Sequence, residues 1–87
     1  MAKEELLKSL GARIVELRGK KGLSQQELAS ACNFEKSNMS RLESGNTNPT
    51  VYTLYKIAQA LEVEISDIVK DIDKSLWQST KQAHSPI

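Results

Sequence analysis

Hydrophobic residues in the first part of the chain recur at helical spacing and end at a glycine. Leu6, Leu7, Leu10, Ile14 and Leu17 fall on one stripe when the chain is wound as a helix. This pattern predicts a helix over about residues 3–21, with Gly22 as its stop. Ser24 and Glu27 then form the capping-box pattern that starts a second helix, predicted over residues 25–32.

The remaining pattern also predicts helices. Asn33 tolerates a left-handed turn, and a third helix is predicted over residues 35–44, ended by Gly45. "NTNP" is a loop by composition, Thr50 is the expected cap of a fourth helix, and a fifth begins near Ile65. Because the chain carries no strand pattern, the expected fold class is all-α, with five short helices and a C-terminal extension.

Composition limits what such a protein can be. The chain has 87 residues, 39% of them hydrophobic and 26% charged, which fits one small soluble domain. Cys32 is the only cysteine, so no internal disulfide can form, and no cluster has metal-ligand spacing. These features predict a cytoplasmic protein without a cofactor. The N-terminus "MAKEELLK" does not resemble a signal peptide, and no apolar run is long enough to span a membrane.

Charge is unevenly distributed along the chain. Residues 1–61 hold nine Lys/Arg against six Asp/Glu, a net +3, whereas residues 62–87 hold three against five, a net −2. A basic body with an acidic tail points weakly to a polyanion as partner, although many inert domains have the same asymmetry.

The second and third predicted helices form a specific motif. Two short helices joined by a tight turn make a helix-turn-helix unit, whose second helix can lie in the DNA major groove. The stretch "LSQQELASACNFEKSNMSRLESG" resembles this unit in the Cro/cI-like, or XRE-type, transcription regulators, and "NPTVYTLYKIAQALEVEISDIV" resembles the two helices that follow it there. The resemblance covers about residues 6–69. Asn33 replaces the commoner glycine of the turn, and Glu64 is a poorer helix start than the usual Ser or Pro.

The resemblance implies a five-helix lambda-repressor-like DNA-binding domain over residues 1–69. Residues 70–87 would form an extension that is partly helical and then flexible. In that extension "STKQAHSPI" has no pattern, and His84 stands alone, so it is not expected to be a ligand.

The third predicted helix has a polar arc opposite Met39 and Leu42. This arc holds two cations and three hydroxyls without an acid: Lys36, Ser37, Ser40, Arg41 and Ser44. Many polar arcs are simply solvated, but the resemblance implies that Lys36, Ser37 and Arg41 face DNA bases, with Ser40 beside them. Arg41 is expected to read guanine through its rigid guanidinium fork, and a plain phosphate contact is the alternative.

Other residues are expected to support this helix. The resemblance implies a phosphate contact by Gln25, and small polar side chains at Asn46, Thr47 and Asn48 suit the same role, although they are also ordinary loop residues. It also implies a structural ion pair between Arg18 and Glu43.

Apolar residues continue beyond the motif. Ile65, Ile68, Val69, Ile72 and Leu76 extend a helical stripe, with Trp77 beside it. We interpret Ile68, Ile72, Leu76 and Trp77 as a dimer interface, because paired heads can reach two DNA half-sites. The alternative is that this helix folds back over its own core.

No catalytic constellation occurs in the sequence, so the protein is not expected to be an enzyme. The predicted function is a sequence-specific regulator of transcription, a repressor or a restriction-modification controller, which binds a palindromic operator in double-stranded DNA as a homodimer. It would act at the cytoplasmic nucleoid. The alternative is an antitoxin that binds a toxin protein and autoregulates its operon.

Overall fold

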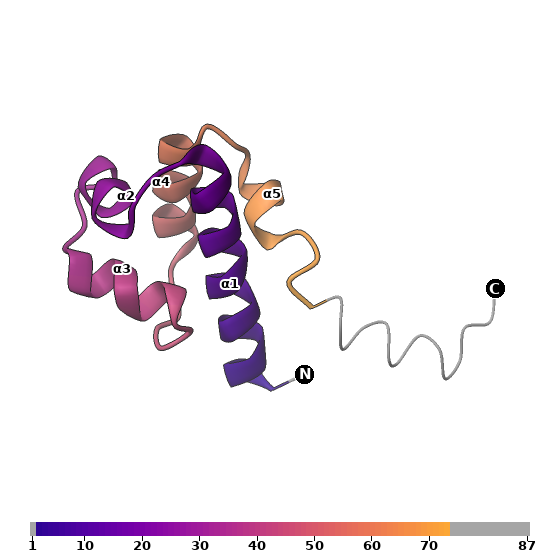
Figure 1. Ribbon diagram of the computed structural model, residues 1–87. Coiled ribbons are helices and arrows are strands. Elements are labelled where there is room, and N and C mark those ends of the chain that lie inside the picture. Colours follow the sequence, from indigo (N-terminus) through magenta and orange to yellow (C-terminus); the bar gives the residue numbers. More distant parts are fainter. Residues whose placement is uncertain (1, 74–87) are drawn as a thin grey trace.

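A computed structural model describes residues 2–73 of the chain, and this part contains five helices and no strand. The helices are α1 (Lys3–Lys21), α2 (Gln25–Ala31), α3 (Lys36–Glu43), α4 (Val51–Leu61) and α5 (Ile65–Val69). In Figure 1, α2 and α3 lie on one side of α1, and α5 lies on the other. The all-α fold class predicted from the sequence is therefore confirmed. None of the helices within residues 2–73 is both long and apolar enough to span a membrane.

Local hydrogen bonds explain where the helices begin and end. Gly22 adopts the left-handed conformation, with φ of 77°, and ends α1. The backbone N–H of Glu27 donates to Ser24 Oγ over 3.0 Å, and the N–H of Ser24 donates to Glu27 Oε1 over 2.7 Å. Thr50 caps α4 by accepting from the N–H of Thr53 over 3.1 Å. These signals are local, which is why the sequence predicted them.

The start of α5 is better stabilised than the sequence suggested. Glu64 precedes the helix, and its backbone N–H donates to Asp67 Oδ2 over 2.9 Å. The guanidinium of Arg13 in α1 also donates from Nε to the backbone oxygen of Asp67 over 2.9 Å. The helix that lacks a good capping side chain is therefore held by Asp67 and by α1.

The turn of the helix-turn-helix unit has the expected form. Asn33 has a positive φ of 59°, a conformation that asparagine tolerates better than most residues. The turn is closed by a backbone hydrogen bond of 2.8 Å from Phe34 to Ala29, and Ala29 is buried where α2 meets the rest of the domain.

The core draws on every helix. One fully buried residue comes from each of the five: Ile14, Leu28, Met39, Ile57 and Ile68. Burying such side chains stabilises the fold by about 1.5–3 kcal/mol each relative to exposure. Because α2, α3 and α5 are too short to be stable alone, this shared core holds them in place.

The structure corrects the prediction for the region after α5. The helix ends at Val69, Lys70 is extended, and Asp71 has a positive φ of 65°, so the helical stripe does not continue through Ile72. Ile68 exposes none of its surface, and Ile72 is partly buried against the core. Ile68 was wrongly assigned to a dimer interface, since it has no surface left to cover. Leu76, Trp77 and His84 lie outside the described residues.

Candidate nucleic-acid interface

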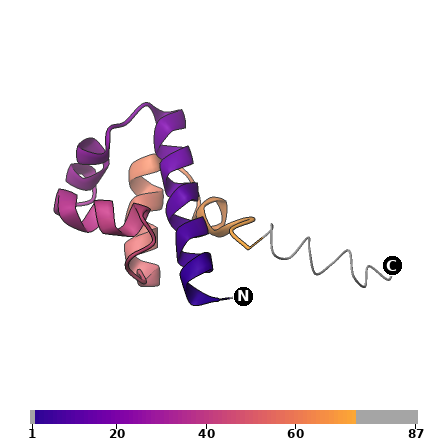
Figure 2. The same cartoon turned by 60° about the horizontal axis from the view of Figure 1, so that its bottom comes forward.

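The third helix, α3, is anchored on one side only. Met39 and Leu42 are buried, whereas Lys36, Ser37 and Arg41 are exposed and Ser40 is half-buried. Figure 2 shows α3 beside α2 at the edge of the bundle, on the side away from α5. Among residues 2–73, Lys36 and Arg41 have no ion-pair partner. The helix therefore presents two uncompensated cations on a polar surface, which suits contact with phosphates and base edges.

The end of α3 is pinned to α1 by an ion pair. Arg18 donates from Nε to Glu43 Oε2 over 2.8 Å and from Nη2 to Glu43 Oε1 over 3.0 Å. The Glu43 side chain is only 4% exposed, so its charge would be costly without this partner. Hydrogen bonding to Glu43 raises the pKa of Arg18, although burial opposes the shift. The pair implied by the family resemblance is present.

The same carboxylate also binds α2. Gln25 donates from Nε2 to Glu43 Oε1 over 2.9 Å, and Arg18 donates from Nη1 to the backbone oxygen of Leu23 over 3.0 Å. Glu43 thus joins α1, α2 and α3. Gln25 was expected to contact a phosphate, and its amide already has this structural partner, which leaves its second N–H for another acceptor.

A close helix crossing fixes the same end of α3. Gly11 of α1 is buried, and a Cβ atom built there would lie 2.3 Å from the backbone oxygen of Glu43. Only glycine allows this approach. The role of Gly11 could not be predicted from the sequence, because the glycine lies inside a helix and its neighbour in space is more than thirty residues away in the chain.

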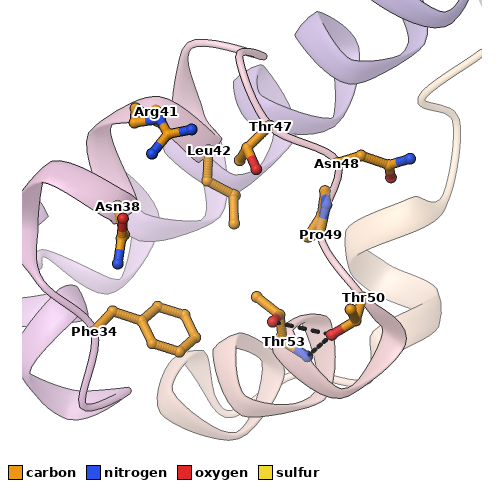
Figure 3. Close-up of a pocket in the computed structure, with 9 residues that line it drawn as sticks. All are labelled: Phe34, Asn38, Arg41, Leu42, Thr47, Asn48, Pro49, Thr50 and Thr53. Carbon is orange, nitrogen blue, oxygen red and sulfur yellow. Dashed lines mark hydrogen bonds between the residues drawn. The ribbon is translucent and has the colours of Figure 1, made fainter.

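A groove runs between α3 and the start of α4 (Figure 3). Its volume is about 240 Å³. It is lined by residues of the turn before α3, of α3 itself, of the loop after it and of α4: Phe34, Asn38, Arg41, Leu42, Thr47, Asn48, Pro49, Thr50 and Thr53. The groove brings Arg41, the expected base reader, together with Thr47 and Asn48, two expected phosphate contacts. Asn46 does not line it, but its backbone N–H donates to the backbone oxygen of Arg41 over 2.8 Å.

Asn38 is a groove residue that the sequence analysis did not single out. It is exposed and lies three residues before Arg41 on α3, so both side chains point to the same groove (Figure 3). Its helical position beside Arg41 was a usable signal. Ser44, at the other end of the polar arc, instead donates its hydroxyl to the backbone oxygen of Ser40 over 2.9 Å.

Fold and site together define a helix-turn-helix regulator of transcription, a DNA-binding protein and not an enzyme. A family model described as "Helix-turn-helix", HTH_3, matches residues 14–68, and the chain belongs to this family. The chain is 39% identical over 71 residues to the "Uncharacterized HTH-type transcriptional regulator y4dJ" of Sinorhizobium fredii, covering 82% of this chain and 92% of that protein.

Solved structures of similar proteins have the same fold. The restriction-modification controller protein C.AhdI from Aeromonas hydrophila is 35% identical, with a TM-score of 0.70 over 71% of this chain and 94% of that chain. The clp gene regulator ClgR from Corynebacterium glutamicum is 27% identical, with a TM-score of 0.78 over 90% and 83%. A chain of a SinR–SinI protein complex is 27% identical, with a TM-score of 0.69 over 88% and 79%.

Proposed function

We propose that this regulator binds a palindromic operator in double-stranded DNA as a homodimer, with α3 of each copy in the major groove. The observation that carries the proposal is the combination of an exposed polar face on α3 with the rigid attachment of its other side. A recognition element must keep its readers in one position, because a small displacement removes the hydrogen bonds that distinguish bases.

Four residues of α3 would contact the bases. Lys36, Ser37, Ser40 and Arg41 would face base edges, with Arg41 donating two hydrogen bonds to O6 and N7 of a guanine. Glu43 lies on the same helix but would not repel DNA, because Arg18 neutralises it at 2.8 Å.

Phosphate contacts would come from the start of α2 and from the loop after α3, on either side of the helix-turn-helix unit. Thr47 and Asn48 border the groove beside Arg41, Asn46 is tied to the end of α3, and Gln25 begins α2. Hydroxyl and amide groups donate to phosphate oxygens and orient the protein on the duplex.

Two small regulators that this chain covers almost completely suggest its role. The chain covers 94% of the controller protein C.AhdI and 92% of the y4dJ regulator, so a repressor or a controller of a restriction-modification system is the role we propose. It would act at the nucleoid in the cytoplasm. The antitoxin alternative stays a prediction, and stable co-purification of a toxin protein from native cells would favour it.

Selection of bound duplexes from a random pool tests the proposal. We expect the full chain to enrich one sequence made of two inverted half-sites, with centres about one helical turn, roughly 34 Å, apart. Enrichment of a single asymmetric half-site would contradict dimeric binding. Failure to enrich any sequence at low salt, with folded protein, would contradict DNA recognition itself.

A further inference from the structure

The outer face of α4 is apolar where a solvated helix would be polar. Val51 is 72% exposed, Tyr52 67% and Tyr55 45%, and we call these three residues the α4 patch. The other exposed large hydrophobic residues within residues 2–73 are Val15 and Val69, which are 39% and 38% exposed. The inner face of α4 is already buried through Leu54, Ile57, Ala58 and Leu61. The α4 patch is therefore surface in excess of what the core needs.

The two tyrosines of the patch contact each other and polar neighbours. The rings of Tyr52 and Tyr55 are stacked with centroids 6.3 Å apart, and Gln59 donates from Nε2 to the Tyr55 hydroxyl over 2.9 Å. Lys56 Nζ lies 5.9 Å from the Tyr52 ring and 5.2 Å from the Phe34 ring. An apolar, tyrosine-rich centre with a polar rim is the usual anatomy of a protein–protein interface. Contacts that side chains already make before association also reduce the entropy lost when two proteins pair.

We propose that the α4 patch is the surface through which two copies of this chain pair. The proposal rests on the proposed function, which needs a dimer on DNA, and it names where the dimer forms. It replaces Ile68 of the predicted interface, whose surface is already buried inside the domain.

The reading capacity of one α3 favours a second copy as the partner. An eight-residue helix with four reading side chains can specify only a few base pairs, whereas a genome offers about 10⁶–10⁹ competing sites. A second identical head doubles the sequence that is read, and a two-fold interface uses the same patch on both copies.

Charge also permits the patch to meet itself. Its three residues are neutral, and α4 contains no Asp or Glu. The one cation of α4, Lys56, is at the edge of the patch and lies over two aromatic rings. Two copies can therefore approach without placing like charges at the centre of the contact.

The position of the patch is compatible with DNA binding. It begins at Val51, the first residue of α4, immediately after the loop that closes the groove beside Arg41. However, it includes none of the residues expected to touch bases or phosphates. Pairing through the patch therefore leaves α3 exposed in both copies and keeps the interface close to the DNA-facing side.

The test compares surface variants of the full chain by sedimentation equilibrium. Val51→Ser/Tyr55→Ser removes apolar surface without adding charge, and we expect the dimer dissociation constant to rise at least tenfold. On the duplex selected by the unmodified chain, cooperative occupation of the two half-sites should be lost, while affinity for an isolated half-site duplex stays unchanged. Val15→Ser, at an exposed valine of α1, is the matched control and should leave the dimer unchanged.

Two further variants keep the test decisive. Val51→Glu serves if the double variant folds poorly, because an acid is favourable at the N-terminus of α4. In a symmetric dimer it places like charges at the contact, so this variant should also be monomeric. Leu76→Ser/Trp77→Ser tests the C-terminal residues predicted from the sequence and should leave the dimer intact.

Three results would overturn the proposal: dimers of unchanged affinity in the folded α4 variants, dissociation caused instead by the C-terminal variant, or an unmodified chain that is monomeric both alone and on two half-sites. A dimer that dissociates as expected but never binds DNA would contradict the proposed function and leave the pairing surface intact.

Discussion

Arg41 is the residue that we propose as the main reader of base sequence. It is exposed on α3, borders the groove with Thr47 and Asn48, and has no ion-pair partner among residues 2–73. Glu43, two positions further on, is instead buried and paired. Arg18 and Gln25 bind its carboxylate, and its side chain is only 4% exposed. Burial thus separates these two charged residues of α3, because Arg41 can reach a ligand whereas Glu43 holds the fold together.

Replacing Arg41 should separate base reading from phosphate binding. Arg41→Ala should weaken binding to the selected duplex by roughly 1–3 kcal/mol, and Arg41→Lys should also bind it more weakly, because lysine keeps the charge but lacks the guanidinium fork. Binding to a random duplex, measured by fluorescence anisotropy at the same salt concentration, should change little in either variant. Equal losses on both duplexes for Arg41→Ala, with recovery in Arg41→Lys, would instead assign Arg41 to a phosphate.

Cys32 has a structural role in the core. Its side chain is 1% exposed, and burial raises the pKa of its thiol, with a smaller opposing effect from Lys56. A buried, protonated thiol is a poor nucleophile, so Cys32 is a small apolar residue of the core and not a reactive group.

Among the helices, α1 is the one that positions α3. Its residues Gly11 and Arg18 both meet Glu43, the first through a close backbone crossing and the second through an ion pair. Because the two contacts lie seven residues apart on α1, they restrict both the distance and the direction of α3. The helix α3 is short, and this support from α1 and α2 compensates for its few apolar residues.

Two glycines of α1 should respond to alanine in opposite directions. Gly11→Ala places a Cβ against the backbone of α3 and should destabilise the domain by about 1–3 kcal/mol or more, as overpacking does. Gly19→Ala is the matched control, because Gly19 is exposed in the same helix with nothing within 4 Å of the new Cβ, and it should stabilise by about 0.5–1 kcal/mol. Urea denaturation followed by circular dichroism measures both. A Gly11→Ala variant as stable as the unmodified chain would show that α1 and α3 do not cross this closely.

At the scale of the whole molecule, the net charge of +1 gives little long-range attraction for DNA. Lys20 and Lys21 add less than the sequence suggests, because they pair with Glu16 and Glu62. The proposed phosphate contacts, from Gln25 and the loop after α3, are neutral groups. Specific hydrogen bonds, and pairing of two heads, would therefore have to supply much of the affinity.

This charge distribution predicts how salt acts on binding. A neutral donor does not neutralise a phosphate, whereas each added cation that does so steepens the slope of log K against log[salt] by about 0.9. Thr47→Lys should therefore raise affinity at low salt and steepen this slope by about that amount per head. Ser66→Lys, on the exposed surface of α5, adds the same charge and should leave the slope nearly unchanged. Equal slopes for the two variants would place Thr47 away from the DNA backbone.

The order of the residues alone was enough to predict the local features of this fold. Helix starts and stops depend on residues within one turn of one another, so Ser24, Thr50, Gly22 and Asn33 could be assigned to caps and turns from their order alone. The family motif added the face of α3 and the Arg18–Glu43 pair. The identification of a helix-turn-helix regulator needed no coordinates.

Contacts between residues far apart in the chain could not be predicted in this way, because they depend on how the helices pack. Ile68 and Val51 are both apolar, so burial is favourable for each of them. Which of the two is buried depends on which helices pack together. Ile68 faces the shared core and is fully buried, whereas Val51 is 72% exposed on α4. In the same way, the closeness of Gly11 to Glu43 and the bond of Gln25 to that carboxylate arise where α1, α2 and α3 meet. Hydrophobicity is a property of each residue, but contact is a property of the packed helices, and so the candidate pairing surface became visible only in the fold.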